Sequence, residues 1–222
     1  MAKIPSSGGG SKFEYSVIDN DTYEARLVRL IFVGVQPQRP FKGQAKPDAL
    51  QAKLAFELIG ETITVTNTED GSKETRPAMV FNDIIIPGGG TTRGKAFDLI
   101  QACVGAEACF DDTEDYRQLL NCGVSVTVGS YVGQKTGKLT NCVDAVGALG
   151  KKAKERLEDS TVDNIFFDCY ADDAGSKEVF ATLGKFIQDK IKEAKDAQYI
   201  PAITQEWPTE KPSDDSDDKD EF

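Results

Sequence analysis

The sequence predicts a mainly β fold with added helices, and three patterns support this expectation. Residues 27–35 form an apolar run that only Arg29 and Gly34 interrupt, which is typical of a strand buried on both faces in the middle of a sheet. Several other segments alternate between apolar and polar residues and are separated by turn signals. Helical spacing is confined to a few segments. At 222 residues, the chain is long enough to bury a core as one domain.

The first long strand is expected over residues 22–36. β-Branched and aromatic residues favour a strand there, and Pro37 and Pro40 directly after it prevent continued pairing. Gly34 predicts a bend or bulge, which a strand needs when it curves far enough to serve two sides of a small barrel.

Two further strands are expected to follow as a hairpin. Residues 50–65 alternate between apolar and polar positions, with an interruption at Gly60. Asp70 and Gly71 predict the tip of the hairpin, which leads into a third strand over residues 78–86.

The middle of the chain predicts two short helices and three more strands. Helical spacing begins in residues 96–104, and a second short helix is expected at residues 114–120. Strands are expected at residues 124–132 and 139–146, and residues 165–170 are a further strand candidate.

The longest helix is predicted near the C-terminal end. Ser176 is suited to cap its N-terminus, and apolar residues recur at helical spacing from Val179 to Ile191. The pattern leaves open whether this helix packs on its own domain or on a second subunit of a homodimer.

Three strands, a helical connection, two strands and a terminal helix follow one another in the order of an OB-fold, a five-stranded Greek-key barrel. This fold binds oligonucleotides across its second and third strands and across the loops that follow its first and fourth strands. We therefore expect a flexible N-terminus (1–14), an OB-fold domain (15–149), a strand and helix extension that packs on the barrel or on a partner subunit (150–203), and a disordered acidic tail (204–222).

Charge and cysteine content limit the classes of function. The net charge is −11, but the last 19 residues hold eight acids and two lysines, so that they carry −6 of it. A basic face on the body is therefore compatible with the overall acidity. The absence of histidine and of any CxxC spacing among five cysteines argues against zinc sites and histidine-based catalysis. No apolar run resembles a signal peptide or a membrane span, so we expect a cytoplasmic protein.

Two acid-free basic loops are the strongest candidates for a binding surface. Each loop combines cations, which can follow phosphates, with an aromatic ring on which a base can stack. The alternative is that the loops are merely solvated and that Phe41 caps the core. Arg29 and Arg76 are strand arginines that could add contacts or could form ion pairs. The candidate DNA-binding residues are Arg29, Arg39, Phe41, Lys42, Lys46, Arg76, Tyr131, Lys135 and Lys138.

Three segments of the body resemble the OB-fold single-stranded DNA-binding proteins of bacterial viruses. They are residues 23–36 (YEARLVRLIFVGVQ), residues 56–58 (FEL), and residues 119–128 (LLNCGVSVTV) with the hairpin that follows. The resemblance implies a non-enzymatic bacteriophage protein that coats single-stranded DNA during replication, recombination and repair, in the cytoplasm of the host. It implies no cofactor, no metal and no membrane partner.

The C-terminal tail resembles the same proteins more closely, because an acidic run ends in a terminal aromatic residue. An exposed aromatic beside a run of acids suits a basic-rimmed apolar pocket on a partner. The resemblance implies that the tail docks on a replication protein such as a polymerase, helicase or primase. The tail residues concerned are Asp214, Asp215, Asp217, Asp218, Asp220, Glu221 and Phe222.

A competing motif lies between the third strand and the first helix. The sequence GGTTRGKA, which begins at Gly89 and ends at Ala96, matches the GxxxxGK pattern of a phosphate-binding P-loop, and Asp168 could serve as a magnesium partner. However, Ala96 stands where a magnesium-binding Ser or Thr is needed, and the strands do not alternate with helices as in a parallel NTPase sheet. A P-loop NTPase therefore remains an alternative, and a non-enzymatic viral adaptor, in which the barrel binds protein, is another.

Overall fold

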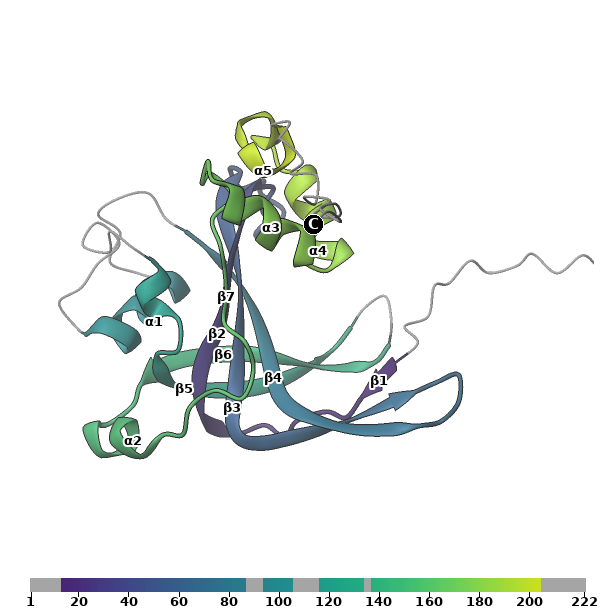
Figure 1. Cartoon of the computed structure of the whole chain (residues 1–222), viewed down its shortest axis with the longest axis vertical. Coiled ribbons are helices and arrows are strands. Elements are labelled where there is room, and N and C mark those ends of the chain that lie inside the picture. The colour runs from purple at the N-terminus through teal and green to yellow at the C-terminus, as the bar shows by residue number, and fades with distance from the viewer. Residues whose placement is uncertain (1–12, 87–93, 106–115, 134–136, 205–222) are drawn as a thin grey trace, which may run out of the picture.

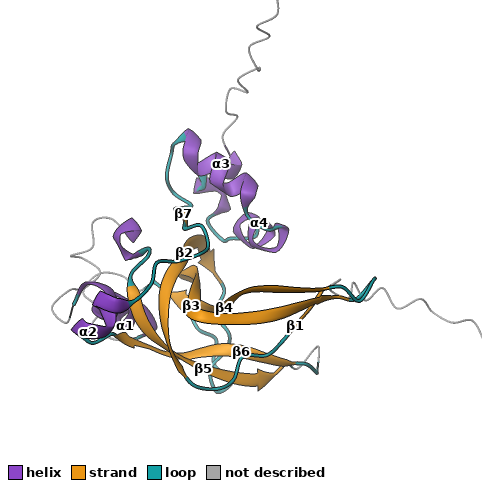
Figure 2. Cartoon of the chain, turned by 60° about the horizontal axis from the view of Figure 1, so that its bottom comes forward, coloured by secondary structure: helices purple, strands orange, loops and turns teal. Residues whose placement is uncertain are grey.

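The computed structural model describes residues 13–86, 94–105, 116–133 and 137–204, and it shows an open, mainly antiparallel sheet with added helices (Figures 1 and 2). The fold class predicted from the sequence is therefore confirmed at this level. The seven strands are β1 (Phe13–Tyr15), β2 (Thr22–Gln36), β3 (Ala49–Asn67), β4 (Lys73–Ile85), β5 (Gly123–Val132), β6 (Leu139–Ala148) and β7 (Ile165–Phe167).

Strand β2 is the centre of the sheet, as its two-sided apolar run predicts. It pairs with β3 and β5 in antiparallel orientation and with β7 in parallel orientation. The register against β3 shifts between Leu27 and Arg29 and again between Phe32 and Val35. Gly34 lies inside the second shift with a φ of 75°, so the predicted irregularity at this glycine is confirmed.

The outer strands β4 and β6 approach each other but are not hydrogen-bonded to each other among the described residues. β4 pairs with β3, and β6 pairs with β5, but among the described residues no ladder joins β4 to β6. Helix α1 (Lys95–Val104) contacts both of these strands. The sheet is thus not closed, and the OB-fold barrel expected from the sequence is not confirmed.

The β3–β4 hairpin is longer than predicted. Its register shifts between Glu57 and Thr62, around Gly60 with a φ of 82°, and then continues to Thr66, which pairs with Lys73. The ladder runs through the predicted interruption because Gly60 adopts a left-handed conformation that lets the strand continue after a bulge. The tip lies at the predicted turn, where Gly71 donates a hydrogen bond to the carbonyl of Asn67 at 2.9 Å.

The prediction of one continuous C-terminal helix is wrong, because this region forms two separate helices. Asp173, not Ser176, caps α3 (Ala174–Thr182), and its side chain accepts a hydrogen bond from the backbone of Ser176 at 2.7 Å. Leu183 is extended, with a ψ of 143°, and Gly184 then caps α4 (Lys185–Lys192). The remaining helical elements are the 3₁₀ turns η2 (Tyr116–Leu119) and η3 (Ala197–Tyr199), and the short helices α2 (Lys151–Arg156) and α5 (Pro201–Thr204).

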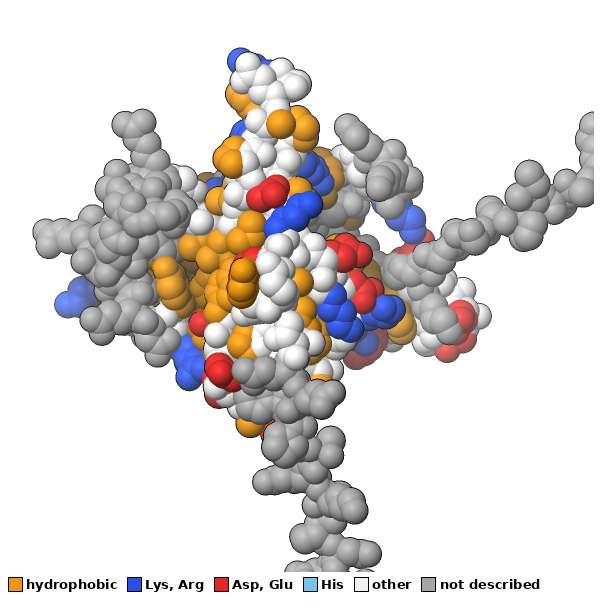
Figure 3. Space-filling model, turned by 90° about the horizontal axis from the view of Figure 1, so that it is seen from above, with side chains coloured by type: hydrophobic (Ala, Val, Ile, Leu, Met, Phe, Trp, Pro, Cys, Tyr) orange, Lys and Arg blue, Asp and Glu red, His pale blue; other side chains and the backbone are white. Residues whose placement is uncertain are grey.

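The C-terminal extension packs on β2 of its own chain. The backbone N–H of Lys195 donates to the carbonyl of Val35 at 2.9 Å, and Gln36 donates to the carbonyl of Lys190, also at 2.9 Å. Phe167 of β7 is buried and contacts Phe180 of α3 with 5.9 Å between ring centroids. Seen from the side of these helices, hydrophobic side chains gather beside charges of both signs (Figure 3).

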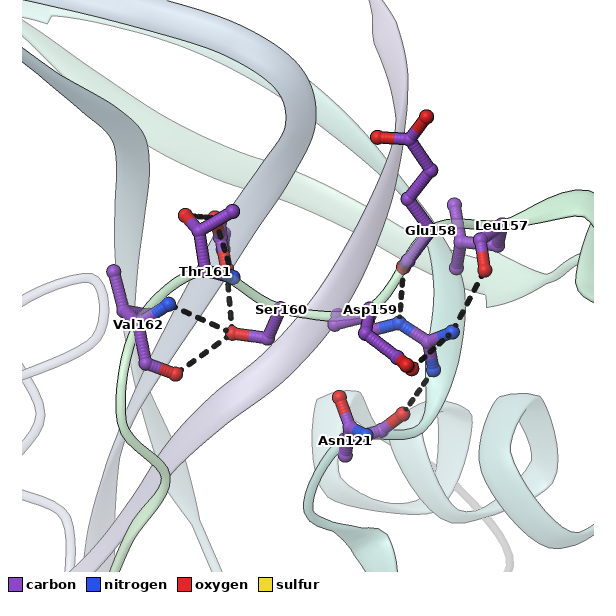
Figure 4. A network of polar contacts seen from close by, with 9 residues as sticks. Asn121, Leu157, Glu158, Asp159, Ser160, Thr161 and Val162 are labelled. Carbon is purple, nitrogen blue, oxygen red and sulfur yellow. Dashed lines mark hydrogen bonds and ion pairs between the residues drawn. The ribbon is translucent and has the colours of Figure 1, made fainter.

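Two paired residues of the sheet hold the segment 157–162 that leads into the extension (Figure 4). Arg26 of β2 and Glu57 of β3 lie directly opposite each other. Arg26 donates to the carbonyls of Asn121, Leu157 and Glu158 at 2.6–2.9 Å. Glu57 accepts hydrogen bonds from the hydroxyls and backbone of the other end of the segment, at Ser160 and Thr161.

This arrangement predicts an acid-sensitive contribution of Glu57 to stability. Burial alone would raise the pKa of Glu57, but the hydrogen bonds outweigh it, so the pKa lies below its ordinary value of 4.5. A carboxyl with a depressed folded pKa stabilises the native state above its unfolded pKa, and this stability is lost as the pH falls through the folded pKa. We expect Glu57→Gln to cost about 1–3 kcal/mol at pH 7.

Urea unfolding from pH 7 to pH 3 measures this effect. The difference between wild type and Glu57→Gln should stay constant down to about pH 4.5 and shrink at lower pH. Glu61→Gln, at an exposed position of the same strand, is the matched control and should change little at any pH. A cost for Glu57→Gln that does not depend on pH would show that the carboxylate charge is not what stabilises this contact.

Candidate nucleic-acid interface

A groove of about 1190 Å³ runs along strand β4. Strands β3 and β4, the segment after β2, the β5–β6 pair and helix α4 all contribute residues to its walls. It contains five of the nine predicted contact residues, namely Arg29, Arg39, Lys46, Arg76 and Tyr131. Phe41, Lys42 and Lys138 do not line it, and Lys135 lies outside the described residues.

The walls of the groove are basic and aromatic. The cations are Arg29, Arg39, Lys46, Arg76, Lys95 and Lys190, and the aromatic residues are Tyr15, Phe81 and Tyr131. Asp83 is the one acidic side chain among the described lining residues. In a chain of net charge −11, a concave surface with six cations and one acid is a marked local reversal of sign.

One cross-strand row brings an arginine and an aromatic ring to the same face of the sheet. Arg29 pairs with Ala55, and Ala55 pairs with Phe81, so the three side chains project from the same side. Phe81 is 61% exposed, whereas Ala55 between it and Arg29 is buried. The Nε of Arg29 is buried and has no hydrogen-bond partner within the described part of the chain. The row therefore places an exposed aromatic ring on the face of the sheet that also carries Arg29.

The loop after β2 presents its aromatic residue to solvent. Phe41 and Gln44 exchange two backbone hydrogen bonds of 2.9 Å across a tight turn, and both Lys42 and Gly43 have positive φ. Phe41 is 59% exposed, so the alternative that it caps the core is wrong. The amines of Lys42 and Lys46 lie 5.4 Å and 5.1 Å from the centre of its ring. Cations and ring thus form one exposed cluster beside the groove.

Two of the predicted cations are partly neutralised. Lys138 lies 2.7 Å from a carboxylate oxygen of Glu14, and a hydrogen bond from this amine lowers the pKa of Glu14. Arg76 lies 2.6 Å from a carboxylate oxygen of Glu74. Exposed pairs of this kind are worth little, so a phosphate can compete for either cation.

Sequence reasoning missed Phe81 and Lys190 among the lining residues. Residues 78–86 have apolar side chains on both faces of the strand, and this pattern could have indicated an exposed apolar face at Phe81. Lys190 comes from α4 and reaches Gln51 at 3.2 Å and Asp83 at 3.5 Å. Burial lowers its pKa, and the nearby Lys53 and Arg39 lower it further.

The P-loop alternative gains no support from the described residues. Residues 89–93 lie outside them, and Lys95 donates its amine to the carbonyl of Val143 at 3.1 Å. Asp168 accepts a hydrogen bond from the backbone of Tyr170. Every described strand pair is antiparallel except β2 with β7, whereas a P-loop NTPase needs a parallel sheet.

The predicted tail residues lie outside the described part of the chain; they are Asp214, Asp215, Asp217, Asp218, Asp220, Glu221 and Phe222.

Within the part that is described, no helix has the length and apolar character needed to cross a membrane. Comparisons of this chain with protein-family models, with curated proteins and with solved structures found no match.

Proposed function

We propose that this protein binds single-stranded DNA without sequence preference, in the groove along β4. The observation that carries the proposal is the lining of that groove, with six cations and three aromatic rings against a single acid. Cations can follow the phosphates, and aromatic faces can stack on any base, which is the combination that sequence-independent single-strand binding requires.

The strand arrangement supports the same function. The order β4-β3-β2-β5-β6 has the neighbours of an OB-fold, apart from the pair that would close the barrel. The groove lies beside β3 and β4, the counterparts of the second and third OB strands, and receives Arg39 and Lys46 from the loop that follows the first. We therefore interpret the body as a partly open OB-fold.

The tail extends this proposal to protein partners. The six acids from residue 214 onward and the terminal Phe222 suit a basic-rimmed apolar pocket on a replication or recombination protein. In this proposal the protein coats single strands in the cytoplasm of a phage-infected bacterium and recruits enzymes through the tail. It has no catalytic step of its own.

Fluorescence anisotropy with labelled oligonucleotides tests the proposal. We expect oligo-dT and mixed-sequence single strands to bind with similar affinity, and a duplex of equal length to bind more weakly. The affinity for single strands should fall steeply with salt. If all six groove cations contact phosphates, a plot of log binding constant against log salt concentration should have a slope of about −4. Salt-independent binding, or no binding at low salt, would contradict the proposal. If this chain binds another protein but shows no affinity for DNA, the adaptor alternative would be favoured.

A further inference from the structure

Two cysteines that are distant from the groove lie side by side. Cys103 is near the end of α1, and Cys122 lies in the turn between η2 and β5. Their thiols hydrogen-bond to each other, and the sulfur of Cys122 also lies 3.5 Å from the carbonyl oxygen of Cys103. Both residues are partly exposed. The fold thus brings together two thiols that are 19 positions apart in the chain.

Positive groups on two other elements face this pair. Lys154 of α2 donates its amine to the carbonyl of Ala102 at 3.3 Å, next to Cys103. Arg26 of β2 donates to the carbonyl of Asn121, next to Cys122. The hydrogen bond from Cys103, with the charges of Lys154 and Arg26, lowers the pKa of Cys122 to about 7 although burial opposes this. The same hydrogen bond and burial raise the pKa of Cys103.

Space for a small molecule adjoins Cys103, whereas Cys122 does not line this space. A cavity of about 460 Å³ is lined by Cys103 and Lys154 together with the end of α1 and residues 146–148 of β6. The wall of this cavity carries one cation, Lys154, and one acid, Asp98, so a small disulfide with both amino and carboxylate groups has space and charge partners there.

We propose that Cys103 and Cys122 form a dithiol site that undergoes exchange with small, carboxylate-bearing disulfides of the glutathione class. The Cys122 thiolate attacks one sulfur of oxidised glutathione, forms a mixed disulfide and releases one glutathione thiolate. The Cys103 thiol then loses its proton to the medium and attacks the sulfur of Cys122, which releases the second glutathione. The products are an internal disulfide and two molecules of reduced glutathione, so that the two protein thiols are oxidised and one disulfide is reduced.

The roles of the two cysteines follow from their surroundings. Cys122 is the nucleophile because its thiolate is stabilised by three neighbours. Cys103 is the resolving thiol, because its proton is held in the hydrogen bond to Cys122 until the charge of Cys122 is removed by the mixed disulfide. The resulting bond would tie α1 to the turn that contacts β2, where Asn121 donates to the carbonyl of Leu27 at 2.7 Å.

Peptide mapping of the full-length chain tests the proposal. Cys109 lies in the same tryptic peptide as Cys103, so Cys109→Ala is the parent variant. After incubation with oxidised glutathione at pH 7, mass spectrometry should find the Cys103 peptide linked to the Cys122 peptide. In Cys109→Ala with Cys103→Ala, glutathione should instead remain attached to Cys122. Dithiothreitol should reverse both products.

The pH dependence of alkylation by iodoacetamide supplies a second measurement that needs no disulfide. The rate at Cys122 should follow a midpoint near pH 7, and Cys103→Ala should move this midpoint upward. Cys142 is an internal control, because burial and a hydrogen bond to Asp144 raise its pKa, and it should react several-fold more slowly at pH 7. Glutathionylation of Cys142 in place of Cys122, or the absence of the cross-linked peptide, would overturn the proposal.

Discussion

Replacing Arg39, Lys46 and Arg76 together with alanine is expected to lower the affinity for single-stranded DNA about a hundredfold at 0.1 M salt. All three side chains are exposed and line the groove. Each phosphate contact to a single strand contributes about 0.7 to the log–log salt slope, which corresponds to roughly fivefold in affinity at 0.1 M salt. The slope should therefore flatten by about 2, and the loss should be equal for different base sequences.

A charge-matched variant separates the groove from net charge. Lys73, Lys151 and Lys152 are also exposed, but they do not line the groove. Their triple replacement with alanine removes the same number of charges and should lower affinity only a few-fold, because distant charges are screened at this ionic strength. Equal losses in the two triple variants would mean that binding follows overall charge, and the groove would no longer be the binding site.

The second large effect is expected at Gly34, where alanine should cost about 2–5 kcal/mol of stability. A side chain at a φ of 75° costs about 1–2 kcal/mol, and overpacking adds about 1–3 kcal/mol. A Cβ at this position would lie 2.8 Å from the Cβ of Ala194 and 2.9 Å from an oxygen of Asp196. Asp196 cannot move freely, because it accepts hydrogen bonds from the backbone of Val35 and from the hydroxyl of Tyr170.

Gly60→Ala is the matched control for this experiment. Gly60 has a similar φ of 82°, but no atom lies within 4 Å of the position of its Cβ. It should therefore show only the backbone cost, and the difference between the two variants in urea unfolding measures how tightly the C-terminal extension packs on β2. If both variants lose the same stability, the contact of Gly34 with the extension carries no energy.

Local sequence patterns predicted the strands well, because alternation and turn residues act over a few positions. The two-sided run of β2 and the turn at Gly71 needed no tertiary information. The C-terminal helix was predicted as one piece because its apolar stripe outweighed Gly184, a residue that costs about 1 kcal/mol inside a helix. The open side of the sheet was not predictable from any local pattern, since it depends on where α1 packs against β4 and β6.

Only those groove residues that belong to a local sequence pattern could be predicted. Arg39 and Lys46 were found because they belong to a basic loop, which is visible in composition alone. Lys190 was missed because it reaches the groove through the packing of α4, and its contact with Gln51 spans 139 positions of the chain. Phe81 was predicted only as part of the third strand, and the exposure of one face of that strand was not predicted.

The hydrogen bonds of Arg26 and Glu57 also determine the order in which parts of this protein can fold during synthesis on the ribosome. Both residues belong to the first third of the chain, whereas the segment that they hold is more than 100 positions further on. Strands β2 and β3 can pair early, but β7, which pairs Phe167 with Ile31 of β2, can join the sheet only after about three quarters of the chain have been made. Arg26 and Glu57 therefore lack these partners until synthesis has reached the last third of the chain.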